Sequence, residues 1–172
     1  MELLERFAGG DADAFEALFR QFQQEVYRWI VRIVRDPAAA EDLTVETFWR
    51  IHRARARFDP ARPFGPWARR IATRVALDHL KDAPRETELA REAVEPAAPD
   101  PLERRDLGHA LRRAFARLPP KLRAVATLAL VEEVPQAEIA DALGISPAAV
   151  KSREFRAVRQ LRRALARMGL EP

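Results

Sequence analysis

The chain has 172 residues, of which 48% are hydrophobic, and a formal net charge of +4. Its size and apolar content suit one ordinary domain or two small ones, and its thirty Lys and Arg residues leave room for basic patches that bind an anionic polymer. Cysteine is absent, which excludes disulfides, thiolate catalysis and cysteine-ligated zinc.

Good helix formers dominate most of the chain, because Ala, Leu, Arg and Glu fill the segments between a few clusters of Pro. We therefore expect an all-α fold. The N-terminal segment "MELLERFAGGDADAF" lacks the basic region and apolar run of a signal peptide. No apolar stretch approaches the ~20 residues that span a bilayer. These features predict a soluble, cytoplasmic protein that does not insert into membranes.

Three helical segments are expected in the first half of the chain. Apolar residues recur at helical spacing over residues 14–34 and predict one or two amphipathic helices. Pro37 suits the first turn of the next helix, which we expect to run towards Arg57. Three Pro and one Gly in "FDPARPFGP", residues 58–66, predict a loop, and a further helix is expected to start near Trp67.

Residues 83–103 differ in composition from their surroundings. They contain four Pro and no aromatic residue, and they carry an acidic excess. We therefore predict two small helical domains, residues 1–82 and 104–172, joined by a mobile linker over residues 83–103. In the second domain, residues 107–118 and 122–131 read as two helices on either side of "LPP".

The stretch "EIADALGISPAAVKSREFRAVRQL", residues 138–161, has the pattern of a helix-turn-helix. That motif needs a small residue where its helices cross, a Gly in the turn and an apolar wedge. Ala140 is the small residue, and Gly144 can adopt a positive φ. Ser146 before Pro147 makes a good start for the second helix. The wedge consists of Ile139, Leu143, Ile145 and Val150.

The second helix of this motif carries polar and basic residues near its start, where base edges and phosphates would be reached. We predict that it binds DNA through Ser146, Ala149, Lys151, Ser152, Arg153, Arg156 and Arg159. The alternative is an ordinary helical hairpin whose basic face is merely solvated. The basic run "RQLRRALAR" is explained equally well as a solvated helix surface.

From Ala14 to Leu165 the chain resembles the extracytoplasmic-function (ECF) sigma factors, bacterial subunits of the sigma-70 family that give RNA polymerase its promoter specificity. Three blocks carry the resemblance in order: "AAAEDLTVETFWRIHR", "WARRIATRVALDHLK" and "LRRAFARLPPKLRAVATLALVEEVPQAEIADALGISPAAVKSREFRAVRQL". The resemblance implies that a first domain, region 2, binds core polymerase, recognises the minus-ten element and melts the promoter. It implies that a second domain, region 4, reads the minus-thirty-five element with the helix-turn-helix.

The resemblance also implies a polymerase-docking helix in "AEDLTVETF". Its outward residues, expected to include Asp42, Glu46 and Thr47, would meet the clamp coiled coil of the largest polymerase subunit. From these residues alone, an acidic helix face that merely keeps the protein soluble is the simpler explanation, but the match of the surrounding blocks favours docking.

The segment "RFDPARPFGPW" corresponds to the loop that captures a base flipped out of the minus-ten element. Such a loop needs a stacking wall and cations for the phosphates. Phe58 and Phe64 are alternatively anchors of the loop, and Trp67 is better explained as part of the core. The residues implied to bind minus-ten DNA are Arg57, Phe58, Arg62, Phe64, Arg69, Arg70 and Arg74.

Four positions depart from the family pattern. Arg74 stands where many relatives have Asn, Val45 where a polar residue is usual, Pro135 where a Ser or Thr usually starts the helix, and Glu154 where Leu is usual. The apolar seam of its helix consists of Val150, Val158, Leu161 and Leu165. This seam would turn Glu154 inward, and an unpaired buried carboxylate is costly. We therefore expect Glu154 to reach a cation such as Arg113 or Arg117, or to tilt out to water.

An enzyme and a free-standing transcriptional regulator are the two alternative classes of function. The three His are scattered, and the chain has no metal-ligand spacing, Gly-rich phosphate loop or Ser/His/Asp signature, so we predict no enzymatic activity, no cofactor and no metal. A free-standing helix-turn-helix regulator remains the alternative, although the first domain has no obvious ligand site. The expected partners are core RNA polymerase and promoter DNA, with an anti-sigma protein as a candidate partner.

Overall fold

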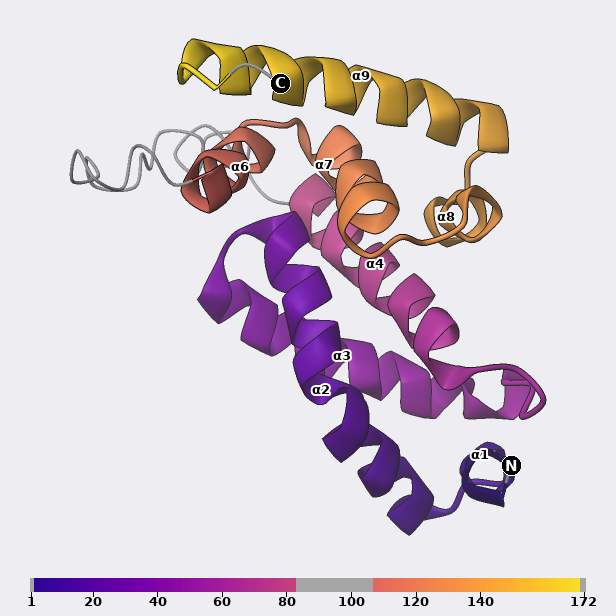
Figure 1. Cartoon of the computed structure of the whole chain (residues 1–172). Helices are drawn as coiled ribbons and strands as arrows, with labels where there is room; N and C mark the ends of the chain where they lie inside the picture. Colours follow the sequence, from indigo (N-terminus) through magenta and orange to yellow (C-terminus); the bar gives the residue numbers. More distant parts are fainter. Residues whose placement is uncertain (1, 83–106, 171–172) are drawn as a thin grey trace. The chain divides into compact units, whose positions relative to one another are not determined.

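The computed structural model describes residues 2–82 and 107–170, and every regular element in these ranges is a helix (Figure 1). The prediction of an all-α fold is confirmed. The chain divides into two compact units, Met1–His79 and Leu80–Pro172. The predicted linker, residues 83–103, lies outside the described residues, so its limits stay a prediction.

The first unit consists of α1 (Glu2–Ala8), α2 (Ala12–Val34), α3 (Pro37–Ala54), the 3-10 turn η1 (Arg55–Arg57) and α4 (Phe64–Asp82) as far as His79. Aspartates cap the starts of two of these helices, as expected for a residue whose side chain accepts from first-turn amides. Asp11 accepts from the backbone N of Asp13 and Ala14, and Asp36 accepts from the backbone N of Ala39. The residues expected to form one or two helices over 14–34 form one, and Pro37 opens the next.

The start of α4 near Trp67 was predicted wrongly, because the helix begins at Phe64. Gly65 and Pro66 therefore lie inside its first turn. This is tolerated because the first amides of a helix have no intrahelical acceptor, so Pro loses no hydrogen bond there. The loop between η1 and α4 is consequently short, residues 58–63.

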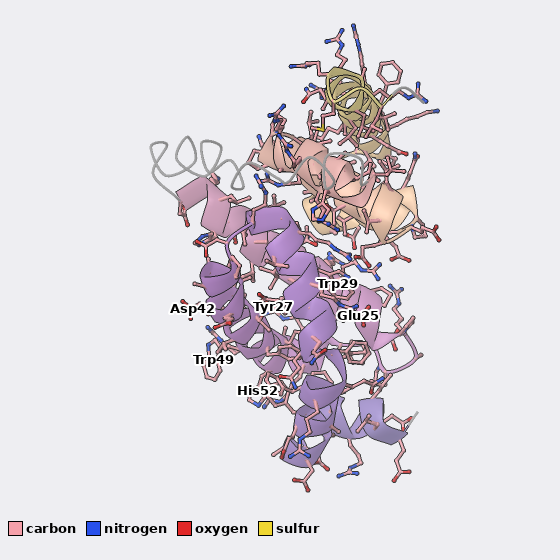
Figure 2. All side chains as sticks on the ribbon, turned by 60° about the vertical axis from the view of Figure 1, so that its left-hand side comes forward. Glu25, Tyr27, Trp29, Asp42, Trp49 and His52 are labelled. Atoms are coloured by element: carbon pink, nitrogen blue, oxygen red, sulfur yellow. The ribbon has the colours of Figure 1, made fainter. Side chains whose placement is uncertain are left out.

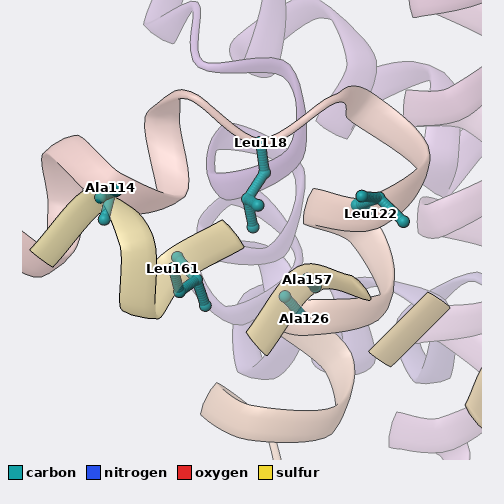
Figure 3. Packing of buried hydrophobic residues seen from close by; sticks show 7 residues of the cluster. Ala114, Leu118, Leu122, Ala126, Ala157 and Leu161 are labelled. Carbon is teal, nitrogen blue, oxygen red and sulfur yellow. The ribbon is translucent and has the colours of Figure 1, made fainter. Parts of the chain in front are cut away.

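The second unit consists of α6 (Leu107–Ala116), α7 (Pro120–Ala126), the π-turn η3 (Thr127–Val131), α8 (Gln136–Leu143) and α9 (Pro147–Arg167). The long helix α9 packs on α6 and α7 through a cluster of small and branched apolar side chains (Figure 3). This cluster contains Ala114, Leu118, Leu122, Ala126, Ala157, Leu161 and Ala164. Because four of the seven are Ala, the helix axes can approach closely without leaving voids.

The helix predicted over residues 122–131 changes its hydrogen bonding in its second half. After Ala126 the backbone widens into a π-turn, in which the N–H of Glu132 donates to the carbonyl of Thr127 over 3.0 Å. The next residue, Glu133, has φ of 51°, in the left-handed region that non-glycine residues rarely adopt. The π-turn could not be predicted from the sequence, because the segment is rich in good helix formers.

Candidate nucleic-acid and protein interfaces

The turn between α8 and α9 has the geometry that the sequence predicts for a helix-turn-helix. Gly144 ends α8 with φ of 65° and ψ of 37°, and the N–H of Ile145 donates to the carbonyl of Ala140 over 3.0 Å. Ser146 then caps α9, because its Oγ accepts from the backbone N of Ala149 over 3.1 Å. Ile139 and Val150 are fully buried between the helices. The predicted motif is confirmed in its geometry.

The outward face of α9 presents most of the predicted DNA-binding side chains. Lys151, Ser152, Arg156 and Arg159 are exposed, and Arg153 is half-buried. Two of the predicted residues, Ser146 and Ala149, stabilise the start of α9 instead. The Oγ of Ser146 accepts the hydrogen bond from the backbone N–H of Ala149, which is itself half-buried.

Phe155 belongs to the same face and was missed from the sequence. It follows Ser152 by three positions and precedes Arg159 by four, so the three side chains lie side by side on the helix. Its side chain is 68% exposed, although Phe is among the residue types most often fully buried. The sequence did contain a signal for this residue, because Phe155 is an aromatic residue at a position of α9 that does not belong to its buried apolar seam.

Positive charge is concentrated on α9. The helix carries the cations Lys151, Arg153, Arg156, Arg159, Arg162, Arg163 and Arg167, against Glu154 as its single carboxylate. Within residues 107–170, no ion pair neutralises these cations. Like charges three or four positions apart on a helix repel one another, so a polyanion beside this face would be bound favourably.

Glu154 does not pair with Arg113 or Arg117, which were named as its cation partners. It is half-buried, and its Oε2 accepts a hydrogen bond from Nε2 of Gln136 over 3.2 Å. Gln136 is the first residue of α8, so a neutral donor from the neighbouring helix takes the place of the expected cation.

The outer face of α3 differs from the predicted docking surface in one residue. Asp42 is exposed, as expected, but Thr47 is fully buried and its Oγ1 donates to the carbonyl of Leu43 over 2.7 Å. The expectation that Thr47 faces outward is wrong, because it shares helical spacing with the buried Ala40 and Ile51 and satisfies its hydroxyl on its own backbone.

Glu46, the third predicted docking residue, is half-buried and already paired. Its Oε1 accepts from Nε of Arg50 over 2.7 Å, and Arg50 also reaches Asp78 of α4 over 3.3 Å. These hydrogen bonds, foremost the one that Arg50 donates to Glu46, raise the pKa of the Arg50 guanidinium. Glu46 is therefore part of an ion-pair network with Arg50 and Asp78 that links α3 to α4, and it is not an unpaired carboxylate.

Two exposed apolar side chains lie beside these charges and were not identified as site residues from the sequence. Val45 is 66% exposed and Trp49, four positions later, is 56% exposed. The Trp49 ring stacks on His52, with the ring centroids 6.2 Å apart, and Figure 2 shows Asp42, Trp49 and His52 along the same side of α3. Their spacing of three, four and three residues places all four side chains on one outward strip.

The two phenylalanines of the predicted minus-ten site are buried. Phe58 is 5% exposed and Phe64 is 3% exposed, with their ring centroids 5.9 Å apart, and Trp67 lies 4.8 Å from Phe58. They do not form an open stacking wall. Of the two roles considered for them, the structure agrees with that of loop anchors, and Trp67 packs with them as a half-buried core residue.

The predicted cations around this loop fall into two groups. Arg57 directly precedes the loop, Arg62 lies within it, and both are exposed; Nε of Arg62 lies 3.6 Å from Asp59, too far for a tight hydrogen bond. On α4, Arg74 is exposed and Arg70 is half-buried. Arg69 is half-buried, and its guanidinium carbon lies 4.6 Å from the centroid of the Trp29 ring, so it serves the packing of α4 on α2.

Neither a metal cluster nor a membrane span is found in the part of the chain that the structure describes. Residues 2–82 and 107–170 contain no group of three or more His, Asp and Glu side chains arranged to hold a metal ion. Over the same residues, no helix combines the length and apolar character needed to cross a bilayer.

Two family models match the chain, one in each unit. Sigma-70 region 2 matches residues 18–86, and Sigma-70, region 4 matches residues 108–161. The RNA polymerase sigma factor CarQ of Myxococcus xanthus is 37% identical over 175 residues, covering 98% of this chain and 98% of its own. The ECF RNA polymerase sigma factor BldN of Streptomyces coelicolor is 37% identical over 172 residues, which are 96% of this chain and 65% of BldN.

Solved structures agree with this assignment. CnrH, determined in complex with the cytosolic domain of CnrY, has a TM-score of 0.68 and 25% identity, and the match covers 95% of both chains. The sigma factor RpoE of Bartonella quintana, determined with the anti-sigma factor NepR, also has a TM-score of 0.68, at 19% identity, and supports the fold alone. With two sigma-70 regions in order and a full-length relative at 37% identity, the chain belongs to the ECF sigma factors of RNA polymerase.

Proposed function

We propose that this sigma factor divides promoter recognition between its two units, with residues 1–82 acting as region 2 and residues 104–172 as region 4, joined by the linker 83–103. The observation that carries the proposal is the exposed cationic face of α9 directly after a well-formed helix-turn-helix. A helix in this position places its N-terminal half in the major groove.

In region 4, we assign Ser152, Phe155 and Arg156 to base contacts and Arg159 to the phosphate backbone. An Arg can bind guanine with two hydrogen bonds, and an exposed aromatic side chain can contact the methyl group of thymine. Lys151 and Arg153 flank this set and would hold phosphates. These contacts would read the minus-thirty-five element.

In region 2, the outward strip of α3 is assigned to core polymerase. Its centre is apolar, formed by Val45 and Trp49, and its N-terminal end is acidic, with Asp42 exposed. An exposed aromatic side chain ringed by charges has the composition of an interface hot spot. Thr47 supports this strip from behind and would not touch the partner.

The loop of residues 58–63 is assigned to the minus-ten element. Arg57 and Arg62 would hold phosphates of the melted strand, and the buried Phe58 and Phe64 would fix the two ends of the loop. Arg70 and Arg74 on α4 extend the same cationic surface along the strand.

A free-standing regulator is not favoured, because the unit that precedes the helix-turn-helix matches a polymerase-binding region of sigma factors. We propose that the protein acts in the cytoplasm, has no catalytic centre of its own and directs the chemistry of the polymerase by differential binding. An anti-sigma protein is proposed as a regulator on the basis of the family; the similar CnrH was itself determined bound to another protein, the cytosolic domain of CnrY.

Reconstitution with core polymerase tests the proposal. The full chain should co-migrate with core enzyme and direct initiation at specific sites in a randomised promoter library. Asp42→Lys should weaken the complex, whereas Glu16→Lys, which reverses an exposed charge on α2, should not. Operator binding by the chain alone, without association with core enzyme, would instead establish a free-standing regulator.

A further inference from the structure

The first helix, α1, lies outside the segment that matches Sigma-70 region 2, which begins at residue 18. Phe7 on this helix is nonetheless fully buried. Figure 1 shows α1 beside the turn that joins α3 to α4, where the short loop of residues 58–63 is found. A helix of seven residues is too short to be stable alone, so its place must be set by tertiary contacts.

Phe7 touches both ends of that loop. Its ring centroid lies 5.8 Å from Phe58 at the start of the loop and 5.6 Å from Phe64 at its end, both in edge-on geometry. It also lies 6.2 Å from Trp67 in the first turn of α4. Phe7 therefore completes an aromatic cluster with Phe58, Phe64 and Trp67, and this cluster holds both ends of the loop together.

Two further contacts hold α1 in this place. Gly10, with φ of 92°, packs against Arg55 of η1 so closely that an added Cβ would lie 3.3 Å from Nε of Arg55. Arg55 in turn donates from Nη1 to the carbonyl of His52 over 2.8 Å. On the other side, Nε of Arg6 donates to Oδ2 of Asp11 over 2.7 Å and joins α1 to the start of α2.

The loop has few bonds of its own. The N–H of Phe58 donates to the carbonyl of Arg55, and the N–H groups of Ala61 and Arg62 both donate to Asp59, to its side chain and its carbonyl respectively. Local bonds of this kind order a short turn but do not fix its position on the domain. The aromatic cluster supplies that position.

We propose that α1 is a positioning element for promoter melting: through Phe7 it holds the loop of residues 58–63 in the conformation in which Arg57 and Arg62 receive the melted strand. This inference rests on the proposed role of the loop in minus-ten binding. Fixing the loop before DNA arrives reduces the conformational entropy lost on binding. Phe7 contacts no DNA itself and acts only through Phe58 and Phe64.

The test uses the full chain, alone and with core polymerase, and compares Phe7→Ala with Ile30→Ala. Ile30 is also fully buried, but it lies on α2 outside the aromatic cluster, so its truncation controls for lost stability. Phe7→Leu is the milder variant if Phe7→Ala fails to fold. Hydrogen exchange at the amides of Phe58, Ala61 and Arg62 reports on the loop directly.

We expect Phe7→Ala to speed exchange at these amides by about tenfold more than Ile30→Ala does. It should also slow open-complex formation on duplex promoters, with rescue on pre-melted templates and unchanged affinity for core polymerase. Equal exchange in the two variants would overturn the inference, as would equal rescue by pre-melting. Faster exchange without a melting defect would also overturn it.

Arg62→Ala separates this inference from the function on which it rests. If Arg62→Ala melts duplex promoters normally, the assignment of the loop to minus-ten DNA fails. If Arg62→Ala is defective and Phe7→Ala is not, the loop assignment stands and the positioning role of α1 is refuted.

Discussion

Gln136, the first residue of α8, donates a hydrogen bond to Glu154 in the middle of α9, with 3.2 Å between Nε2 and Oε2. The bond spans the two helices of the helix-turn-helix at a position where the apolar seam of α9 turns the carboxylate inward. A neutral donor at the edge of the interface satisfies the carboxylate without requiring a buried cation.

A double-mutant cycle measures this contact. Because the pair lies near solvent, Gln136→Ala and Glu154→Ala should show a coupling free energy of about 0.5 kcal/mol, at the low end for hydrogen bonds. Urea unfolding of the single and double variants gives the value. Additive effects would mean that the two side chains do not interact in solution.

Glu133 should be a position where glycine stabilises the protein. Its φ of 51° places a side chain in the left-handed region, which costs an L-residue roughly 1 kcal/mol. Glu133→Gly should therefore raise the free energy of unfolding by up to about 1 kcal/mol. The neighbouring Glu132, with φ of −95°, is the matched control, and Glu132→Gly should lower stability. A loss of stability in both variants would mean that the left-handed backbone at Glu133 does not destabilise the protein.

Trp49 should dominate the binding of α3 to core polymerase. Since its side chain is 56% exposed, Trp49→Ala opens no cavity and should leave the thermal midpoint nearly unchanged. The loss of an aromatic hot spot should weaken the complex with core polymerase roughly 30-fold, and Trp49→Phe should recover much of the affinity. Titration of labelled protein against core enzyme gives both values; unchanged affinity would remove the strip from the interface.

Phe155 and Arg159 should contribute differently to promoter binding. Arg159→Ala removes a phosphate contact, so it should weaken all promoters alike and lower the salt slope of binding by about one. Phe155→Ala removes no charge, so the slope should stay constant while affinity falls by about 1 kcal/mol at sites with a thymine at the contacted position. Holoenzyme binding to promoter variants over a range of salt distinguishes the two; equal slopes for both variants would refute the division of roles.

The tether between α1 and α2 should weaken in acid. The hydrogen bond from Arg6, followed by that from the Ala14 amide, lowers the pKa of the Asp11 carboxyl. A carboxyl whose pKa is lowered by folding contributes stability above its unfolded pKa of about 3.9, and this contribution is lost as the pH falls through the folded value. Asp11→Asn keeps a capping side chain but removes the charge.

Thermal midpoints of wild type and Asp11→Asn should therefore differ at pH 7 and converge as the pH falls below about 4. Asp13→Asn, at an exposed carboxylate in the first turn of α2, is the control for the loss of charge near the helix start. A difference between wild type and Asp11→Asn that does not shrink as the pH falls below about 4 would mean that ionisation of Asp11 does not carry the effect.

The sequence by itself determined the features that depend on local chemistry. Helical periodicity predicts the long helices, and the prolines at positions 37 and 147 predict where two of them begin. Gly144 and Ser146 determine the turn of the helix-turn-helix, because a positive φ and a side-chain cap are properties of single residues. The order of the three sequence blocks was sufficient to indicate the family.

The tertiary structure decided which side of a residue meets solvent and which distant residue it meets. Helical spacing puts Thr47 on the buried face of α3 with Ala40 and Ile51, but the family resemblance, which does not specify burial, placed it outward. Phe58 and Phe64 in a Pro-rich loop looked available for stacking until Phe7, some fifty residues earlier, covered them. Contacts between residues so far apart depend on how whole helices pack, and no local pattern specifies that.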